Sequence, residues 1–152
     1  SMKRVLQALI GAGLKTVIAE MPAARTAQEA ADSVGCHIDQ IAKSIIFAGQ
    51  FSGTALLFLT AGSNQVDKEK ASALAQDPLI KADAALIRAQ TGFAIGGVAP
   101  LGHVNPIRAW IDPRLMEFDQ ICAAAGTPHH VFSISPVELA EVTGGKVADF
   151  TS

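Results

Sequence analysis

Residues 44–61 read Ser-Ile-Ile-Phe-Ala-Gly-Gln-Phe-Ser-Gly-Thr-Ala-Leu-Leu-Phe-Leu-Thr-Ala. Two apolar runs of strand length, 44–48 and 54–61, flank the segment 49–53, whose two glycines and serine favour a turn. This stretch therefore predicts a β-hairpin with two largely buried strands. Neither run approaches the roughly 20 apolar residues that a membrane-spanning helix needs, and no other run in the chain does so.

Helical and strand patterns surround the predicted hairpin on both sides. Apolar residues at positions 5, 6, 9 and 10 repeat with a helical period over 3–12. Thr26 and Glu29 have the spacing of a capping box at the start of a helix over 26–34, and Gly35 is placed to end it. Similar signals predict further helices over 67–75, 82–90 and 136–143, and further strands over 16–19, 107–111, 121–125 and 131–134.

The order of these elements indicates the fold class. Strands and helices are intermixed, and hairpin links take the place of regular strand–helix–strand repeats, which favours an α+β fold with a mixed sheet. Glycine and proline punctuate residues 91–106, so we expect an ordered, tightly turned loop there. A length of 152 residues is typical of a single domain, which we expect to span residues 1–152.

The composition limits the classes of function. Apolar residues make up 49% of the chain, which excludes an intrinsically disordered protein. The formal net charge is −2, so the chain lacks the basic surplus of proteins that wrap duplex nucleic acid, and any such contact should be small and local. Cys36 and Cys122 are too few for a disulfide framework or a four-cysteine zinc site, and we expect structural thiols. Ser1 precedes Met2 as an expression remnant would, and no signal-peptide pattern follows, which predicts a cytoplasmic location.

Two motifs are candidates for binding or catalysis, and each has two interpretations. Lys43 is the only charged residue between Asp39 and Asp67. It is either a solvent-facing residue at a strand edge or a lysine at the rim of a pocket, aimed at a phosphate or carbonyl oxygen. The segment Gly96-Gly97-Val98-Ala99-Pro100-Leu101-Gly102 is either a tight turn or a loop whose main-chain N–H groups face a ligand oxygen. Its spacing matches neither a P-loop nor a dinucleotide-binding loop.

Two further features carry less information. The adjacent residues His129 and His130 point to opposite faces of a strand, so they cannot easily bind one metal ion together. They form a surface pair, or one of them faces a pocket. Asp112 follows a strand and precedes Pro113, a position typical of a turn cap. Because no serine elbow and no supported cysteine–histidine pair is present, a protein nucleophile is hard to find, and we expect neither a metal ion nor a cofactor.

In their order along the chain, these motifs resemble the YbaK-like aminoacyl-tRNA deacylases, which include prolyl-tRNA-editing proteins and the editing insertion of bacterial prolyl-tRNA synthetases. The resemblance extends from about Thr26 to Asp149 and rests on residues 41–47, 91–102, 109–112 and 124–126. It implies a strongly twisted mixed sheet flanked by helices. It also implies hydrolysis of the ester between a wrong amino acid and the terminal adenosine of a tRNA. In this family the free 2′-hydroxyl of that adenosine helps to activate water, which would explain the missing nucleophile.

The resemblance also implies roles for individual residues. Lys43 matches the family lysine that contacts the tRNA end, and the loop from Gly96 to Pro100 matches the one that positions the substrate carbonyl and amine. His130, rather than His129, lies where several relatives carry a functional histidine. The expected site comprises the catalytic residues Lys43, Gly96, Gly97, Pro100 and His130, and the substrate-binding residues Met21, Ala27, Ala30, Val98, Ala99 and Asp112. The small alanines predict a small uncharged amino acid, somewhat larger than alanine, and the resemblance implies that tRNA for proline carries it.

Two other classes of function stay open at this point. A non-catalytic module that binds a tRNA end or a nucleotide would also use Lys43, but it would not need Gly97 to face an ester. A metal-dependent hydrolase using His129 or His130 lacks the usual ligand spacing. The expected partner is the acceptor end of tRNA, and the near-neutral charge favours a synthetase or another translation factor that supplies tRNA affinity. Neither DNA nor a membrane is expected as a partner.

Overall fold

The hairpin expected from residues 44–61 forms the middle of the protein. The structure, a computed structural model, describes all residues, 1–152. Strands β2 (Ile41–Gly49) and β3 (Ala55–Ala61) pair antiparallel over seven residue pairs. Across the turn the Gly49 N–H donates to the Thr54 carbonyl at 3.0 Å, and Gly53 adopts a φ of 69° that a glycine takes without strain. All seven residues of β3 are buried, as its apolar run predicts.

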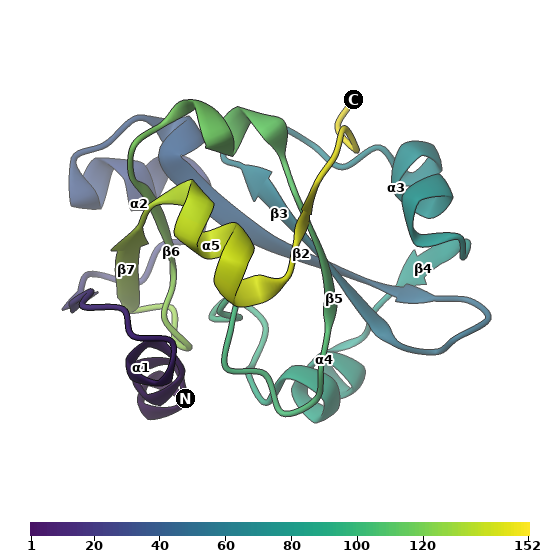
Figure 1. Ribbon diagram of the computed structural model, residues 1–152, viewed down its shortest axis with the longest axis horizontal. Helices are drawn as coiled ribbons and strands as arrows, with labels where there is room; N and C mark the ends of the chain where they lie inside the picture. The colour runs from purple at the N-terminus through teal and green to yellow at the C-terminus, as the bar shows by residue number, and fades with distance from the viewer.

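Eight strands form one mixed sheet in the order β1-β7-β6-β2-β3-β5-β8, and β4 pairs with the end of β2 (Figure 1). The pairs β2–β6, β3–β5 and β5–β8 are parallel, and all other pairs are antiparallel. This arrangement confirms the predicted α+β fold with a mixed sheet. The remaining strands are β1 (Ile18–Glu20), β4 (Leu79–Lys81), β5 (Arg108–Ile111), β6 (Ile121–Ala124), β7 (His130–Ile134) and β8 (Lys146–Val147).

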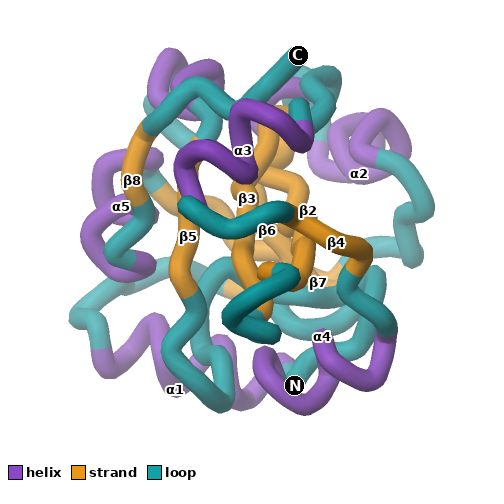
Figure 2. Tube along the Cα trace, turned by 90° about the vertical axis from the view of Figure 1, so that its right-hand side faces the viewer, coloured by secondary structure: helices purple, strands orange, loops and turns teal.

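Five α-helices and two short 3-10 helices surround the sheet (Figure 2). Local signals define the helix that matters most for the site: Thr26 Oγ1 accepts from the Glu29 N–H at 3.1 Å, and Gly35 ends the helix in the left-handed conformation. No helix is long and apolar enough to cross a membrane. The helices are α1 (Met2–Gly11), α2 (Ala27–Val34), η1 (Ile38–Gln40), α3 (Lys68–Ala75), α4 (Ala84–Thr91), η2 (Pro113–Glu117) and α5 (Pro136–Thr143).

The sheet separates two hydrophobic layers. Leu57 and Leu59 of β3 belong to the larger layer, which α1, α4, α5 and the loop over 93–101 cover. On the opposite face Phe58 stacks on Trp110 with 4.9 Å between ring centroids, and α3 and Phe150 cover this smaller layer. Because successive residues of a strand point to opposite faces, a strand between two such layers is apolar on both faces, and in β3 only Thr60 is polar.

A few elements differ from the sequence-based expectations. Strand β1 begins at Ile18 instead of Thr16, and β2 begins at Ile41, where it pairs with both β3 and β6. The elements β4, β8, η1 and η2 were not expected. Each is two to five residues long, too short to show a periodic pattern, and the two strands form because an edge of the sheet is available to them.

Strand β2 exchanges partners along one of its edges. Ile41 and Ala42 pair with β6, whereas Phe47 to Gly49 pair with β4. Residues 43–46 have no strand partner on this edge. The sheet therefore opens beside the middle of β2.

Candidate active site

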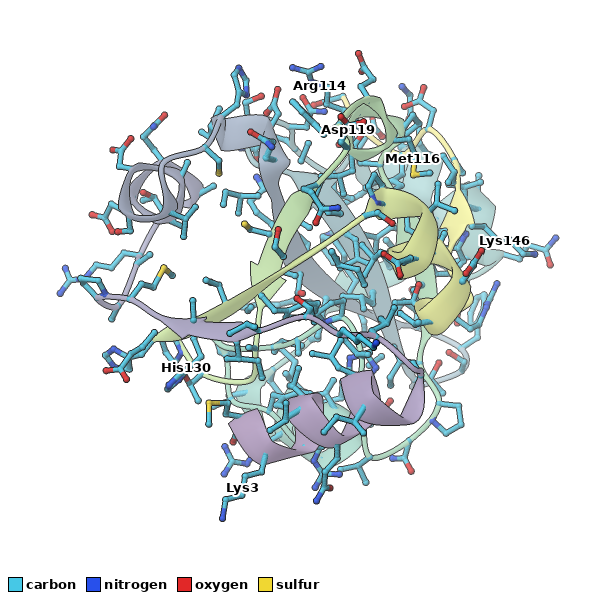
Figure 3. The ribbon with its side chains drawn as sticks, turned by 60° about the vertical axis from the view of Figure 1, so that its left-hand side comes forward. Lys3, Arg114, Met116, Asp119, His130 and Lys146 are labelled. Carbon is cyan, nitrogen blue, oxygen red and sulfur yellow. The ribbon has the colours of Figure 1, made fainter.

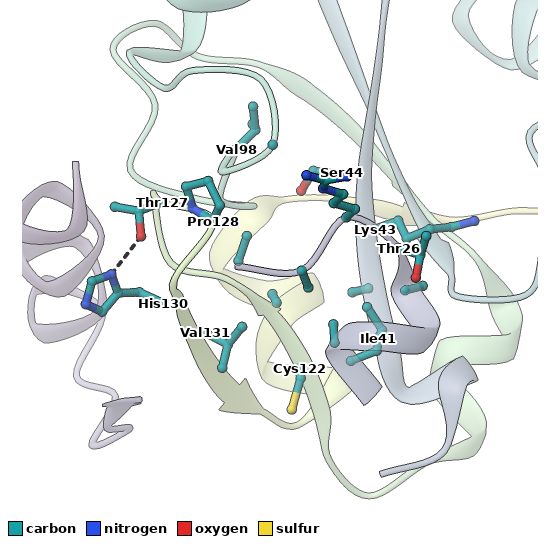
Figure 4. A pocket seen from close by; sticks show the side chains of 18 of the residues that line it. Thr26, Ile41, Lys43, Ser44, Val98, Cys122, Thr127, Pro128, His130 and Val131 are labelled. Carbon is teal, nitrogen blue, oxygen red and sulfur yellow. Dashed lines mark hydrogen bonds between the residues drawn. The ribbon is translucent and has the colours of Figure 1, made fainter. Parts of the chain in front are cut away.

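A cavity of about 470 Å³ lies beside the unpaired segment of β2 (Figure 4). This volume is in the range of small-molecule sites. Its walls come from α2 and the segment before it, from β2, β6 and β7, and from the loops over 95–98 and 127–128. Most lining residues are apolar. Arg25, Lys43 and His130 are the basic residues that border the cavity, and no aspartate or glutamate does.

Helix α2 presents two alanines to the cavity. Ala27 and Ala30 both line it, and their three-residue spacing places them on one face of the helix. Ala30 is almost fully buried and packs with Ala31 and Ile41, so its small side chain lets the helix approach β2. Met21 lies in the same wall, before the helix. The alanines thus serve helix packing and leave room in the cavity at the same time.

Lys43 borders the cavity, but its ammonium group turns away from it. Lys43 Nζ donates to the Asn64 carbonyl at 2.7 Å, and Figure 4 shows the side chains of Lys43 and Ser44 leaving β2 in opposite directions. Burial lowers the pKa of Lys43, and the negative charges of Asp39 and Asp112 partly offset this effect. The bond to Asn64 uses one of the three N–H donors of the ammonium group, so two remain for a ligand.

Asp112 lies outside the cavity wall, because its carboxylate is occupied by the protein's own donors. One oxygen accepts from the Ala61 N–H at 3.0 Å and from Asn64 Nδ2 at 2.9 Å, and the other accepts from the Arg114 N–H at 2.9 Å. The side chain is buried and caps η2. The turn cap, one of the two interpretations of this residue, is therefore confirmed, and direct contact with a ligand in the cavity is not.

Asp39 completes the polar network that positions the Asn64 segment. It accepts hydrogen bonds from the Ser63 N–H at 2.9 Å and from Arg114 Nε at 3.0 Å. Burial alone would raise the pKa of Asp39, but the bonds from Ser63 and the ion pair with Arg114 outweigh it and lower the pKa. Arg114 lies at the top of the view in Figure 3 and His130 at the lower left, so this network is remote from the histidine end of the cavity.

The glycine loop contributes Gly96 and Val98 to the cavity wall, but not Gly97. The Gly97 N–H donates to the Ala94 carbonyl at 3.1 Å and is therefore not free to bind a ligand oxygen. A Cβ atom at Gly97 would lie 2.7 Å from the Cα of Thr127. The missing side chain thus lets the loop approach the backbone of the 127–128 turn, and that close approach closes one end of the cavity.

Ala99 and Pro100 are buried behind the cavity wall and do not line it. The Ala99 carbonyl lies 2.7 Å from His103 Nε2, and this contact joins the middle of the glycine-rich loop to the residues that follow it. These two residues support the shape of the loop, whereas the family resemblance implies that they contact the substrate.

His130, and not His129, borders the cavity. Its Nδ1 atom lies 2.6 Å from Thr127 Oγ1, and its Nε2 atom lies 4.0 Å from a carboxylate oxygen of Glu20. Figure 4 shows the ring turned toward Thr127 at the edge of the cavity. No group of three or more histidine, cysteine, aspartate or glutamate side chains is placed to hold a metal ion.

Neither the thiol nor the serine in the cavity wall is activated as a nucleophile. Burial raises the pKa of Cys122, and burial together with the neighbouring Cys122 raises the pKa of Cys36 to about 11. Both thiols are free and stay protonated at neutral pH. Ser44 Oγ has no hydrogen-bond partner, so no base is in place to take its proton.

Sequence reasoning did not single out Arg25 or Ser44, although both line the cavity. The Arg25 N–H donates to a Glu29 carboxylate oxygen at 2.7 Å, and this bond fixes the residue before the N-cap Thr26 to the first turn of α2. No carboxylate forms an ion pair with the Arg25 guanidinium. The only signal in the sequence was the position of Arg25 directly before the helix cap Thr26.

Comparisons with known proteins cover the whole of this site. The aminoacyl-tRNA editing domain family matches residues 21–142. The uncharacterized protein YwhH of Bacillus subtilis (strain 168) is 29% identical over 122 residues, which are 80% of this chain and 77% of that protein. The proline–tRNA ligase of Shouchella clausii (strain KSM-K16) is 28% identical over 127 residues, 82% of this chain but only 22% of the ligase.

A solved structure is also similar to this chain over nearly its whole length. The crystal structure of a candidate trans-editing enzyme for prolyl-tRNA synthetase shares 43% sequence identity and superposes with a TM-score of 0.93, covering 99% of this chain and 96% of that one. Every residue that lines the cavity falls within the range matched by the editing-domain family. The cavity beside β2 thus lies within the matched domain, and the chain belongs to the aminoacyl-tRNA editing domain family.

Proposed function

We propose that this chain is a hydrolase that acts in trans on misacylated tRNA and cleaves the ester between a small uncharged amino acid and tRNA for proline. The observation that carries the proposal is the chemistry of the cavity: apolar walls, a basic border and no acidic side chain. An uncharged amino acid fits such walls, and the phosphodiester backbone of a tRNA end fits a basic border. The similarity to the candidate trans-editing enzyme supports the choice of proline tRNA.

The reaction needs no nucleophile from the protein. The free 2′-hydroxyl of the terminal adenosine accepts a hydrogen bond from a water molecule, whose oxygen attacks the ester carbonyl carbon. The bond between that carbon and the 3′-oxygen breaks, one proton of the water passes to the 3′-oxygen and the other to solvent, and the amino acid leaves as a carboxylate. Cys122 stays protonated and Ser44 has no base, which is consistent with this route. The protein then contributes by positioning the ester and excluding bulk water.

The size of the cavity sets the range of amino acids. Ala27 and Ala30 leave room on the α2 side, and Met21 occupies part of the same wall. An apolar pocket discriminates by only about 1–3 kcal/mol per methylene group. We therefore expect the enzyme to accept several small side chains with modest selectivity.

The proposal is tested with a panel of charged tRNAs. Proline tRNA is charged separately with alanine, serine, cysteine, threonine, 2-aminobutyrate and proline, and the loss of each ester is followed under single-turnover conditions. We expect faster hydrolysis of one or more of the small non-cognate esters and little hydrolysis of prolyl-tRNA. The same amino acids on alanine tRNA serve as the control for tRNA choice. Tight binding without hydrolysis of any ester would instead indicate a non-catalytic module that binds the tRNA end.

A further inference from the structure

We infer that Ser44 receives the α-amino group of the aminoacyl ester, through its hydroxyl oxygen and its main-chain carbonyl. This inference rests on the proposed function and names a positioning residue for it. Ser44 lines the cavity from the unpaired middle of β2.

The Ser44 hydroxyl is the one buried side-chain nitrogen or oxygen in the protein that has no hydrogen-bond partner. A buried hydroxyl without a partner destabilises a fold, so the hydroxyl contributes nothing to folding at this position. Because the hydroxyl makes no hydrogen bond within the protein, rotation about the Cα–Cβ bond to another staggered position breaks none. The hydroxyl is therefore free to turn toward a ligand.

The main chain of Ser44 also faces the cavity side. Ser44 stands opposite Leu59 in the antiparallel pair, and the Leu59 carbonyl accepts from the Asp112 N–H at 2.9 Å, on the side of β3 away from β2. In an antiparallel pair, the main-chain N–H and C=O groups of two opposite residues either bond to each other or point away from each other on both strands. The N–H and C=O of Ser44 therefore turn away from β3, toward the edge on which residues 43–46 have no strand partner.

The composition of the wall selects the amine as the group that Ser44 binds. An α-amino group has a pKa near 8, so at neutral pH it is largely protonated and needs hydrogen-bond acceptors. No carboxylate lines the cavity to supply them. The hydroxyl of Thr127 lies at hydrogen-bond distance from His130, and it also accepts from the His129 N–H. Ser44 offers two uncommitted oxygens, one on its side chain and one on its main chain.

The test compares Ser44→Ala with the unmodified protein on two esters of the same tRNA. One ester carries alanine, and the other carries propionic acid, which has the same carbon skeleton without the amine. A hydrogen bond to a charged group corresponds to roughly a tenfold to hundredfold change. We expect Ser44→Ala to lower kcat/KM for the alanyl ester by about that factor and to leave the propionyl ester unchanged. The thermal midpoint should stay equal or rise, because an unpartnered hydroxyl has been removed.

Two further variants sharpen the result. Ser44→Thr retains the hydroxyl and should retain most of the preference for the alanyl ester. Ser33→Ala changes an exposed serine of α2 that does not line the cavity, and both esters should react as with the unmodified protein. Equal losses on both esters in Ser44→Ala would overturn the assignment to the amine, and no loss on either would overturn any role in binding.

Failure of the proposed function is distinguishable from failure of this inference. If the unmodified protein hydrolyses neither ester, binding is measured with the non-hydrolysable 3′-amide of alanyl-adenosine. A tenfold weaker affinity of Ser44→Ala for this compound, with no change for the propionyl amide, supports the role of Ser44 without hydrolysis. Equal affinities of the two proteins for both compounds would refute it.

Discussion

Replacing Asp112 with alanine should destabilise the fold by about 3–5 kcal/mol, because three donors lose their acceptor at once. These are the N–H groups of Ala61 and Arg114 and the side-chain amide of Asn64, each 2.9–3.0 Å from the carboxylate. A single buried donor left without a partner costs about 1–3 kcal/mol. The expected loss of about 3–5 kcal/mol is smaller than three fully buried donors would give, because the Arg114 N–H is only part-buried and water can reach it.

Asp112→Asn should destabilise the fold less than Asp112→Ala, because it keeps two of the three hydrogen bonds and removes one. An amide oxygen in the position of Oδ2 still accepts from Ala61 and Asn64, whereas the amide NH₂ faces the Arg114 N–H and can only repel it. We expect a loss of about 1.5–3 kcal/mol, the contribution of one hydrogen bond to a charged group.

Urea unfolding, followed by tryptophan fluorescence, measures the loss of stability in both Asp112 variants. The single tryptophan, Trp110, lies two residues before Asp112 and is buried, so its fluorescence reports unfolding of this strand. The urea midpoint should fall for both variants while the m-value stays unchanged. Asp119→Asn is the matched control, since Asp119 is exposed and makes no ion pair.

Activity then decides between a structural and a substrate-binding role for Asp112. Measured where the protein is fully folded, kcat/KM of Asp112→Asn for the best aminoacyl-tRNA should stay within a few-fold of the unmodified protein, because the Asn64 segment stays in place. A fully stable Asp112→Asn protein that loses a hundredfold in kcat/KM would refute this reasoning and support direct contact with the substrate.

Three other outcomes test the remaining features of the site. Lys43→Met removes the ammonium group but keeps most of the stem, and we expect kcat/KM for aminoacyl-tRNA to fall about tenfold to hundredfold, by the size of one charge-assisted contact to phosphate. Unchanged kinetics would mean that Lys43 serves only Asn64. Ala27→Leu narrows the α2 wall and should lower kcat/KM for the 2-aminobutyryl ester relative to the alanyl ester by about tenfold, whereas an unchanged ratio in a destabilised protein would contradict the pocket assignment. EDTA should leave hydrolysis unaffected, and activity lost on chelation and restored by zinc would instead favour a metal-dependent hydrolase.

The hairpin and the helices could be predicted because their signals are local. Thr26 and Glu29 lie three residues apart, and their capping hydrogen bond forms within a single turn of α2. The turn between β2 and β3 depends on glycines inside the hairpin itself. The shared helix face of Ala27 and Ala30 followed from the same local phase, because the cap fixes where the helix begins, whereas only the family resemblance indicated that this face borders a pocket.

The roles of Gly97 and Lys43 could not be predicted, because both depend on contacts distant in sequence. Position 97 requires a glycine because the backbone of Thr127, thirty positions away in the sequence, leaves no space for a Cβ atom. Lys43 turns toward Asn64, and nothing in its own strand indicates which face of the sheet carries the cavity, because both faces of the sheet bear apolar layers. Strand alternation predicts that Lys43 and Ser44 point apart, but not which of them enters the pocket.

Side-chain alternation along β2 therefore places these two neighbouring residues in different surroundings. Lys43 faces the network of Asp39 and Asp112, in which the donors around both carboxylates are satisfied, whereas Ser44 faces the cavity with a hydroxyl that nothing satisfies. Variants of the network and variants of the cavity should consequently have different effects on stability and on the choice of ester. Asp112→Ala lowers the free energy of unfolding and leaves the choice of ester intact in the molecules that fold, whereas Ser44→Ala leaves the free energy of unfolding equal or higher and weakens the choice of the amine. If both variants changed stability and ester choice together, the cavity and the network would have to be one coupled unit, and the opposite orientations of Lys43 and Ser44 would carry no functional meaning.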